Sequence, residues 1–295
     1  ATPWSPGVDI ADALGDKAPA AAGAQPLPEE MQIDALLARA CASDHSILHD
    51  AATACRTALA QRSALGELPL EGVLQALEMT AIRVLGSLGP VLMLQVKNDE
   101  SNLRKIRDAA AAAAAAGVSV ARIGDLLEWE VDAGLHERGA EVSGHAGACA
   151  HLADPSGTIA LLWMRRSFHL TIEITDCILQ ALGGGASTDE GSPPQPSRDK
   201  GSWNDVSMPD VIRTAYSRSL EPYHGWLMRQ TIMLVAAGSP GADSLVCMLG
   251  VGLGGVDIEA VVEREMRDFV EHARPLLRAL EATYVGHDLE DTRKI

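Results

Sequence analysis

Apolar positions recur along most of the chain with the three-and-four spacing of amphipathic helices. Residues 119–133, for example, place Leu126, Leu127 and Val131 on one side of a short helix. No segment alternates between apolar and polar residues as a strand would. The predicted helices cover about residues 31–61, 70–86, 88–116, 119–133, 158–182, 209–219, 221–237, 242–249 and 257–284. The pattern predicts a layered all-α domain of about eight helices.

Glycine and proline mark where the predicted helices end. An alanine run over 109–116 stops at Gly117, and the helix over 158–182 stops at the glycines of 183–185. Residues 1–29 are rich in Ala, Pro and Gly, which predicts a flexible extension. Gly, Ser, Pro and Asp cluster over 183–207, which predicts an inserted loop. We therefore expect one domain over 30–295, with this loop available to a protein partner.

Composition restricts the ligand and the compartment. The net charge of −16 argues against non-specific nucleic-acid binding and against strong attraction to anionic membranes, so it favours a neutral or weakly charged ligand. Five cysteines without close pairs fit reduced thiols, and no apolar run reaches the length of a spanning helix. These features predict a cytoplasmic protein.

Polar residues on the predicted helix over 88–116 form the first candidate site. Asn98, Asn102 and Lys105 lie at i, i+4 and i+7, which places them on one face, and Asp99 borders that face. Amide and ammonium groups at this spacing can hydrogen-bond adjacent hydroxyls of a sugar. A solvated helix face is the simpler interpretation of this motif taken alone.

Two further segments carry aromatic and basic residues. Trp163 can cover the apolar face of a sugar ring, and Arg165 and Arg166 follow it. His224 can donate to a carbonyl, while Trp226 can pack inside or lie at a membrane–water interface. Taken alone, each segment is better explained by core packing, with a core Trp163 followed by two solvated arginines and a core His224 with a hydrogen-bond partner.

Taken together, three segments resemble the glycolipid transfer protein family in order and spacing. Residues 88–106 (LGPVLMLQVKNDESNLRKI) resemble its D-x-x-x-N-x-x-K helix, residues 160–168 (ALLWMRRSF) its L-L-W-L-K-R-G-L helix, and residues 215–229 (AYSRSLEPYHGWLMR) its A-Y-x-x-x-L-x-x-Y-H-G-W element. The resemblance covers about residues 30–285, with 183–207 as an insertion. It implies a two-layer helical sandwich in which a ceramide occupies an apolar tunnel and a sugar lies at the surface.

The resemblance also assigns roles to residues. It implies that Asn102 and Lys105 hydrogen-bond the first sugar, that Trp163 stacks on it, and that His224 holds the ceramide amide carbonyl. Arg166 would support the site by ion pairing, and Trp226 would dock on the membrane.

One departure from the family pattern lies on the same helix. The family has Asp where this chain has Asn98, so the bond to the ceramide amide and to sugar hydroxyls loses charge assistance. Asp99 takes over this role if the helix is locally rotated. We therefore keep both Asn98 and Asp99 as candidate ligand-binding residues.

The expected function is intermembrane transfer of a glycosphingolipid, without enzymatic chemistry, cofactor or metal. The alternatives are transfer of ceramide-1-phosphate, which a cationic cluster would favour, and a sphingolipid sensor or scaffold that binds without shuttling. An acid–base enzyme built on His224 lacks an accompanying nucleophile motif. Two clusters carry metal-ligand residue types, but structural roles suit them better: Cys41, His45 and His49, and His145, Cys149 and His151.

Overall fold

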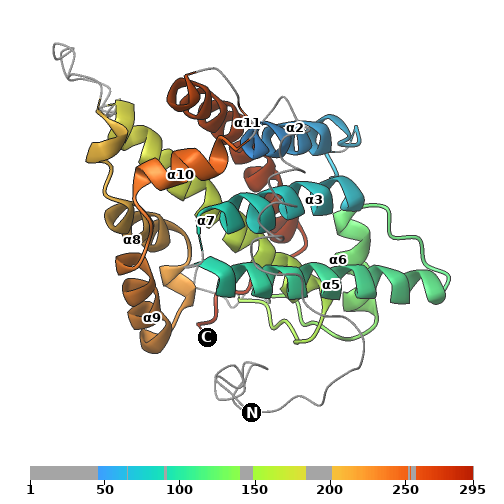
Figure 1. Cartoon of the computed structure of the whole chain (residues 1–295). Helices are drawn as coiled ribbons and strands as arrows, with labels where there is room; N and C mark the ends of the chain where they lie inside the picture. Colours follow the sequence, from blue (N-terminus) through green and yellow to red (C-terminus); the bar gives the residue numbers. More distant parts are fainter. Residues whose placement is uncertain are drawn as a thin grey trace, which may run out of the picture.

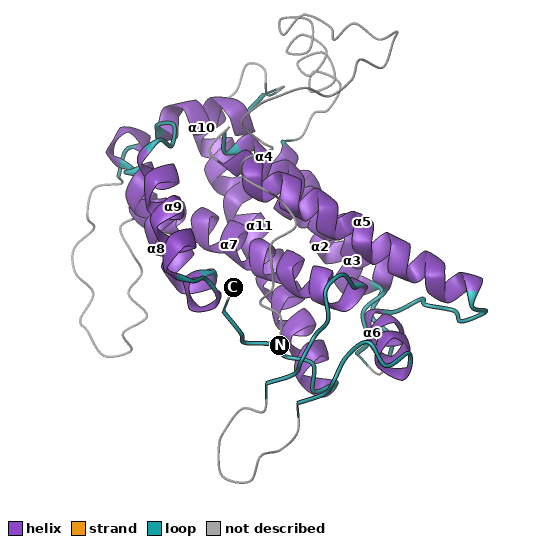
Figure 2. Cartoon of the chain, turned by 90° about the horizontal axis from the view of Figure 1, so that it is seen from below, coloured by secondary structure: helices purple, strands orange, loops and turns teal. Residues whose placement is uncertain are grey.

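The chain folds as a bundle of helices, shown by a computed structural model that describes residues 46–64, 66–89, 92–139, 149–183, 201–251, 253 and 257–294 (Figure 1). Figure 2 shows helices joined by loops throughout this described part. The α-helices are α2 (Ile47–Ala60), α3 (Leu70–Leu77), α4 (Leu85–Ser87), α5 (Met93–Ala115), α6 (Ile123–Asp132), α7 (Gly157–Gly183), α8 (Met208–Ser219), α9 (Trp226–Ala237), α10 (Ala242–Leu249) and α11 (Ile258–Gly286). A π-helical stretch, η1 (Glu78–Val84), links α3 to α4, and the 3-10 turns η3 (Trp203–Asp205) and η4 (Glu221–Tyr223) precede α8 and α9.

Helix α7 connects the two layers of the sandwich. It packs against α5, α8 and α11, and α11 also packs against α2, which in turn contacts α3. Twenty of the residues of α7 are buried, so this helix is covered on nearly all sides, as a central helix is. Seven of the twenty are polar or charged, among them Arg165, Arg166 and Ser167. The predicted all-α, two-layer fold is confirmed.

A carboxylate from α6 fixes the start of α7. Glu130 Oε1 accepts from the N–H of Gly157 at 2.7 Å, and Glu130 Oε2 accepts from Thr158 at 2.8 Å and lies 3.0 Å from His136 Nε2. Burial alone would raise the pKa of Glu130, but these hydrogen bonds bring it below its usual value. A Cβ on Gly157 would lie 2.8 Å from the side chain of Ala109 on α5, so glycine permits the close approach of the two helices. The start of α7, the helix that carries Trp163 and Arg166, is thereby fixed against α5 and α6.

The observed helices follow the predicted ones, with differences at their ends. The helix predicted over 221–237 begins only at Trp226, because residues 221–223 form a 3-10 turn and Gly225 is the N-cap. The helix predicted over 70–86 contains the π-helical stretch of η1. The 1–29 extension, residues 31–45 of the helix predicted over 31–61, and most of the 183–207 loop lie outside the described residues, so the domain limits stay a prediction. Cys41, His45 and His145 of the two candidate metal clusters lie outside them as well.

Candidate functional site

The four polar residues predicted on α5 lie in different environments. Asp99 is fully buried, Asn102 and Lys105 are half-buried, and Asn98 is exposed. Lys105 Nζ lies 2.9 Å from Asp154 Oδ1, in the loop before α7. The face of α5 that meets α7 therefore carries Asp99, with Asn102 one turn further on, and Asn98 lies about 100° around the helix from Asp99.

Asp99 belongs to a small buried network between α5 and α7. Ser167 Oγ donates to Asp99 Oδ2 at 2.5 Å, and Gln95 Nε2 donates to Asp99 Oδ1 at 3.1 Å. Burial raises the pKa of the Asp99 carboxyl to about 8, although both hydrogen bonds oppose the rise. Asp99 is thus mostly protonated at neutral pH. A neutral carboxyl group can both donate and accept, as recognition of amides and hydroxyls requires.

Trp163 and His224 come together from segments 61 positions apart in the sequence. Their rings are stacked, with centroids 5.9 Å apart and planes 22° from parallel. The guanidinium of Arg166 lies 4.6 Å from the centroid of Trp163 and 3.6 Å from that of Tyr223, so the cation is held between two aromatic rings. Trp163 is half-buried, whereas Arg166 and His224 are each only 4% exposed.

His224 is neutral in this environment. Burial lowers the pKa of His224 to about 4, and the positive charges of Arg166 and Arg229 add to this effect. The Tyr216 hydroxyl lies 3.0 Å from His224 Nδ1. When Tyr216 donates to Nδ1, the ring proton is on Nε2, and His224 can donate to a ligand carbonyl.

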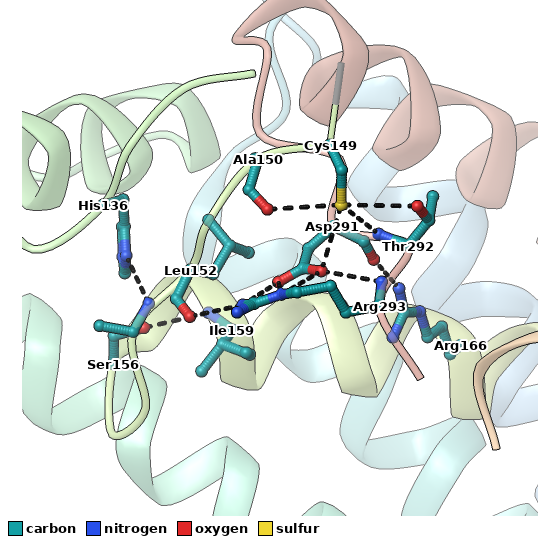
Figure 3. A network of polar contacts seen from close by, with 11 residues as sticks. His136, Cys149, Ala150, Leu152, Ser156, Ile159, Arg166, Asp291, Thr292 and Arg293 are labelled. Carbon is teal, nitrogen blue, oxygen red and sulfur yellow. Dashed lines mark hydrogen bonds and ion pairs between the residues drawn. The ribbon is translucent and has the colours of Figure 1, made fainter. Parts of the chain in front are cut away.

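The C-terminal residues supply partners that the sequence analysis did not identify. Arg166 donates to the carbonyl oxygen of Asp291, and Figure 3 shows this bond beside the contacts of Asp291 with Arg293. Arg165 donates to both carboxylate oxygens of Glu290, at 2.8 and 2.6 Å. The other residues that sequence reasoning missed are Gln95, Asp154, Ser167, Tyr216 and Tyr223. Only Tyr223 and Tyr216 carried a usable signal, because both belong to the motif that contains His224.

Helix α9 begins two residues after His224 and presents apolar side chains to solvent. Trp226, Leu227 and Leu234 are 74%, 66% and 76% exposed, and Ala236 is the one buried residue of this helix. Within the described residues, no single helix has the length and apolarity to cross a bilayer; α9 and α10 reach that threshold only as a pair, and the pair is bent by 85°.

Comparison with known proteins agrees with this geometry. A family model described as "Glycolipid transfer protein (GLTP)" matches residues 73–251, which is more than half of the chain. A curated relative, the ACD11 homolog protein of Arabidopsis thaliana, is 25% identical over 87 residues, which is 30% of this chain and 35% of that relative. The match thus spans about a third of the relative's length.

Solved structures share the fold at low sequence identity. The apo form of mouse ceramide-1-phosphate transfer protein has a TM-score of 0.59 at 16% identity, covering 84% of this chain and 99% of that one. A FAPP2 structure, described as selecting simple glycosphingolipids with the GLTP fold, has a TM-score of 0.58 at 19% identity, covering 85% and 97%. A mutant of Arabidopsis ACD11 complexed with ceramide-1-phosphate has a TM-score of 0.56 at 18% identity, covering 82% and 95%. With the three sequence segments, the stacked Trp163–His224 pair and the family match in agreement, this chain belongs to the glycolipid transfer protein family.

Proposed function

We propose that the chain carries one glycosphingolipid at a time between membranes and catalyses no reaction. The polar groups that α5, α7 and the segment before α9 supply suit an uncharged headgroup joined to an amide. Trp163 offers an aromatic surface to a sugar, His224 offers a donor to a carbonyl, and Asp99 offers a neutral carboxyl group.

The observation that carries the choice of headgroup is that the cations of the site already have partners in the protein. Lys105 pairs with Asp154, Arg165 with Glu290, and Arg166 donates to Asp291 and lies between two aromatic rings. A phosphate would need at least one of these cations to give up its partner. A sugar needs only uncharged hydrogen-bond donors and acceptors, so the arrangement favours a glycosylated lipid.

The proposed membrane-docking surface consists of Trp226, Leu227 and Leu234 on α9. Because the protein carries a large negative charge, apolar burial rather than attraction to anionic lipids has to supply docking. Tryptophan is favoured at the membrane interface. His224 lies two residues before α9, so docking through this helix would bring the headgroup site to the bilayer surface.

The lipid chains would enter between the two layers. Residues such as Phe168, Phe269 and Tyr284 fill that interior and are less than 2% exposed. Two surface hollows of about 280 and 300 Å³ lie elsewhere, beside the end of α11 and between η1 and α5. Since these side chains occupy the space between the layers, we propose that uptake moves the layers apart, and burial of the chains would offset this at about 0.8 kcal/mol per methylene.

Transfer of ceramide-1-phosphate is the second candidate. Four of the solved structures similar to this chain are described as complexes with ceramide-1-phosphate. Lys105, Arg165 and Arg166 would give a phosphate three donors if their present partners were released.

The test is a side-by-side vesicle-to-vesicle transfer assay with fluorescent galactosylceramide, glucosylceramide, ceramide-1-phosphate and phosphatidylcholine. We expect the two glycosylated lipids to move and phosphatidylcholine to stay. Movement of ceramide-1-phosphate alone would replace our proposal by the second candidate. Binding without transfer would indicate a sensor or scaffold. The absence of both binding and transfer would exclude a sphingolipid ligand.

A further inference from the structure

The chain after α11 packs against the rest of the molecule, and we call this segment the C-terminal strap (residues 288–293). Asp288 turns the chain with a φ of 55°, and Leu289 is fully buried. The backbone of the strap accepts from Gly139 at Asp288 O (2.9 Å) and from Ala150 at Glu290 O (3.1 Å). The strap is therefore anchored before it reaches the candidate site.

Two consecutive residues of the strap hold two consecutive arginines of α7. Glu290 receives two hydrogen bonds from Arg165, and the carbonyl oxygen of Asp291 accepts from Arg166. Within the part of the chain that the structure describes, the guanidinium of Arg166 donates to one acceptor, the carbonyl oxygen of Asp291. Arg166 Nε is buried without a hydrogen-bond partner. The guanidinium also lies over the rings of Trp163 and Tyr223, which attract its positive charge.

Side chains at the end of the strap fix the position of Asp291 (Figure 3). Arg293 donates through Nε to both carboxylate oxygens of Asp291 at 2.9 Å and through its backbone N–H at 3.0 Å, and Arg293 NH2 donates to Leu152 O at 2.9 Å. The N–H of Thr292 lies 3.2 Å from Cys149 Sγ. These contacts tie the strap to residues 149–152, immediately before Asp154, the partner of Lys105.

We propose that the C-terminal strap positions Arg166 between Trp163 and Tyr223 and thereby sets the headgroup preference of the site. With the strap in place, the guanidinium of Arg166 donates to the Asp291 carbonyl, and the site presents uncharged donors and acceptors to a ligand. With the strap released, the buried guanidinium loses its acceptor, and a desolvated cation without an acceptor is costly. It then turns toward solvent or toward an anionic headgroup. The part of this inference that concerns lipids rests on the proposed function.

The position of Arg166 can be read out without any lipid, at His224. The charged and titratable groups facing His224 are Arg166 from α7, Tyr216 from α8 and Arg229 from α9. Movement of Arg166 away from the aromatic rings removes one of the two positive charges that disfavour the imidazolium. The pKa of His224 then rises.

The test compares two charge-neutral double variants of the full chain. Asp291→Ala/Arg293→Ala removes the ion pair that fixes Asp291, while Leu289 and Glu290 still anchor the strap. Asp288→Asn/Lys294→Ala is the matched control, because both side chains are exposed and asparagine tolerates the positive φ at position 288. The pKa of His224 is measured by NMR titration of the ligand-free protein, with the resonance assigned by its loss in His224→Gln. The ratio of glucosylceramide to ceramide-1-phosphate transfer is measured in parallel.

We expect the first double variant to raise the pKa of His224 and to lower the glucosylceramide to ceramide-1-phosphate ratio by about tenfold, the scale of one charge-assisted hydrogen bond. The control should match the unmodified chain in both. An unchanged His224 pKa would overturn the proposal even if the lipid ratio changed, because Arg166 would not have moved. If the double variant loses its helical circular dichroism, Arg293→Gln is measured in the same two ways. If the unmodified chain moves neither lipid, the proposed function fails, and the titration still decides whether the strap positions Arg166.

Discussion

Asp99 offers the most direct physical test of the site, because its carboxyl group should make folding dependent on pH. Burial raises the pKa of this group from an ordinary value of 3.8 to about 8. The folded protein then retains a proton that the unfolded chain has already lost between these two values. Stability from this group is fully present below about pH 4 and is lost as the pH rises through about 8.

The magnitude follows from the size of the shift. Each pKa unit corresponds to about 1.4 kcal/mol, so a shift from 3.8 to about 8 corresponds to about 6 kcal/mol once the carboxylate is ionised in both states. Asn in place of Asp99 keeps an acceptor oxygen for Ser167 and cannot ionise. Between about pH 5 and pH 8, Asp99→Asn should therefore gain about 3 to 4 kcal/mol of stability relative to the original chain.

Urea unfolding followed by circular dichroism at several pH values measures this difference. His169 and His224 also titrate in this range, and since burial lowers their pKa values, they raise stability as the pH rises. Comparison of Asp99→Asn with the original chain cancels their contribution. Asp108→Asn, an exposed position on the same helix, is the control. A stability difference that does not change with pH would show that Asp99 is ionised and would remove the neutral carboxyl group from the proposed site.

Three further predictions concern lipid handling. Trp163→Ala should abolish glycolipid transfer while the helical circular dichroism signal is kept; normal transfer by this variant would exclude a stacking role. Asn98→Asp should leave glycolipid affinity unchanged in a binding titration, because Asn98 is exposed and Asp99 occupies the face that meets α7. Tighter binding would assign the headgroup contact to Asn98 instead. Trp226→Ala should weaken vesicle binding more than binding of a short-chain soluble glycolipid, and equal losses would argue against α9 as the docking surface.

The helices could be predicted because their signals are local. The alanine run and Gly117 mark the end of α5, and the glycines after residue 182 mark the end of α7. The π-helical stretch of η1 could not be predicted, since its residues have the apolar spacing of an ordinary helix and the insertion depends on packing against α2, α5 and α7.

The choice between Asn98 and Asp99 shows where sequence spacing reaches its limit. Asn98, Asn102 and Lys105 share a face by spacing alone, and the family resemblance supports the same register. The rotation of α5 is set by other contacts, namely by buried Val96, Leu103 and Ile106 and by the bond from Ser167 to Asp99. One residue of difference is a rotation of about 100°, which separates a buried carboxyl from an exposed amide.

The partners of the arginines were beyond prediction for a different reason. Arg165 and Glu290 are 125 positions apart, and so are Arg166 and Asp291. Neither acceptor lies in a periodic segment, and one of them is a backbone carbonyl that any residue could supply. Because these contacts hold the cations inside the protein, they bear directly on whether the site takes a sugar or a phosphate. Our proposal therefore places the control of headgroup preference on residues outside the motifs by which the family is recognised.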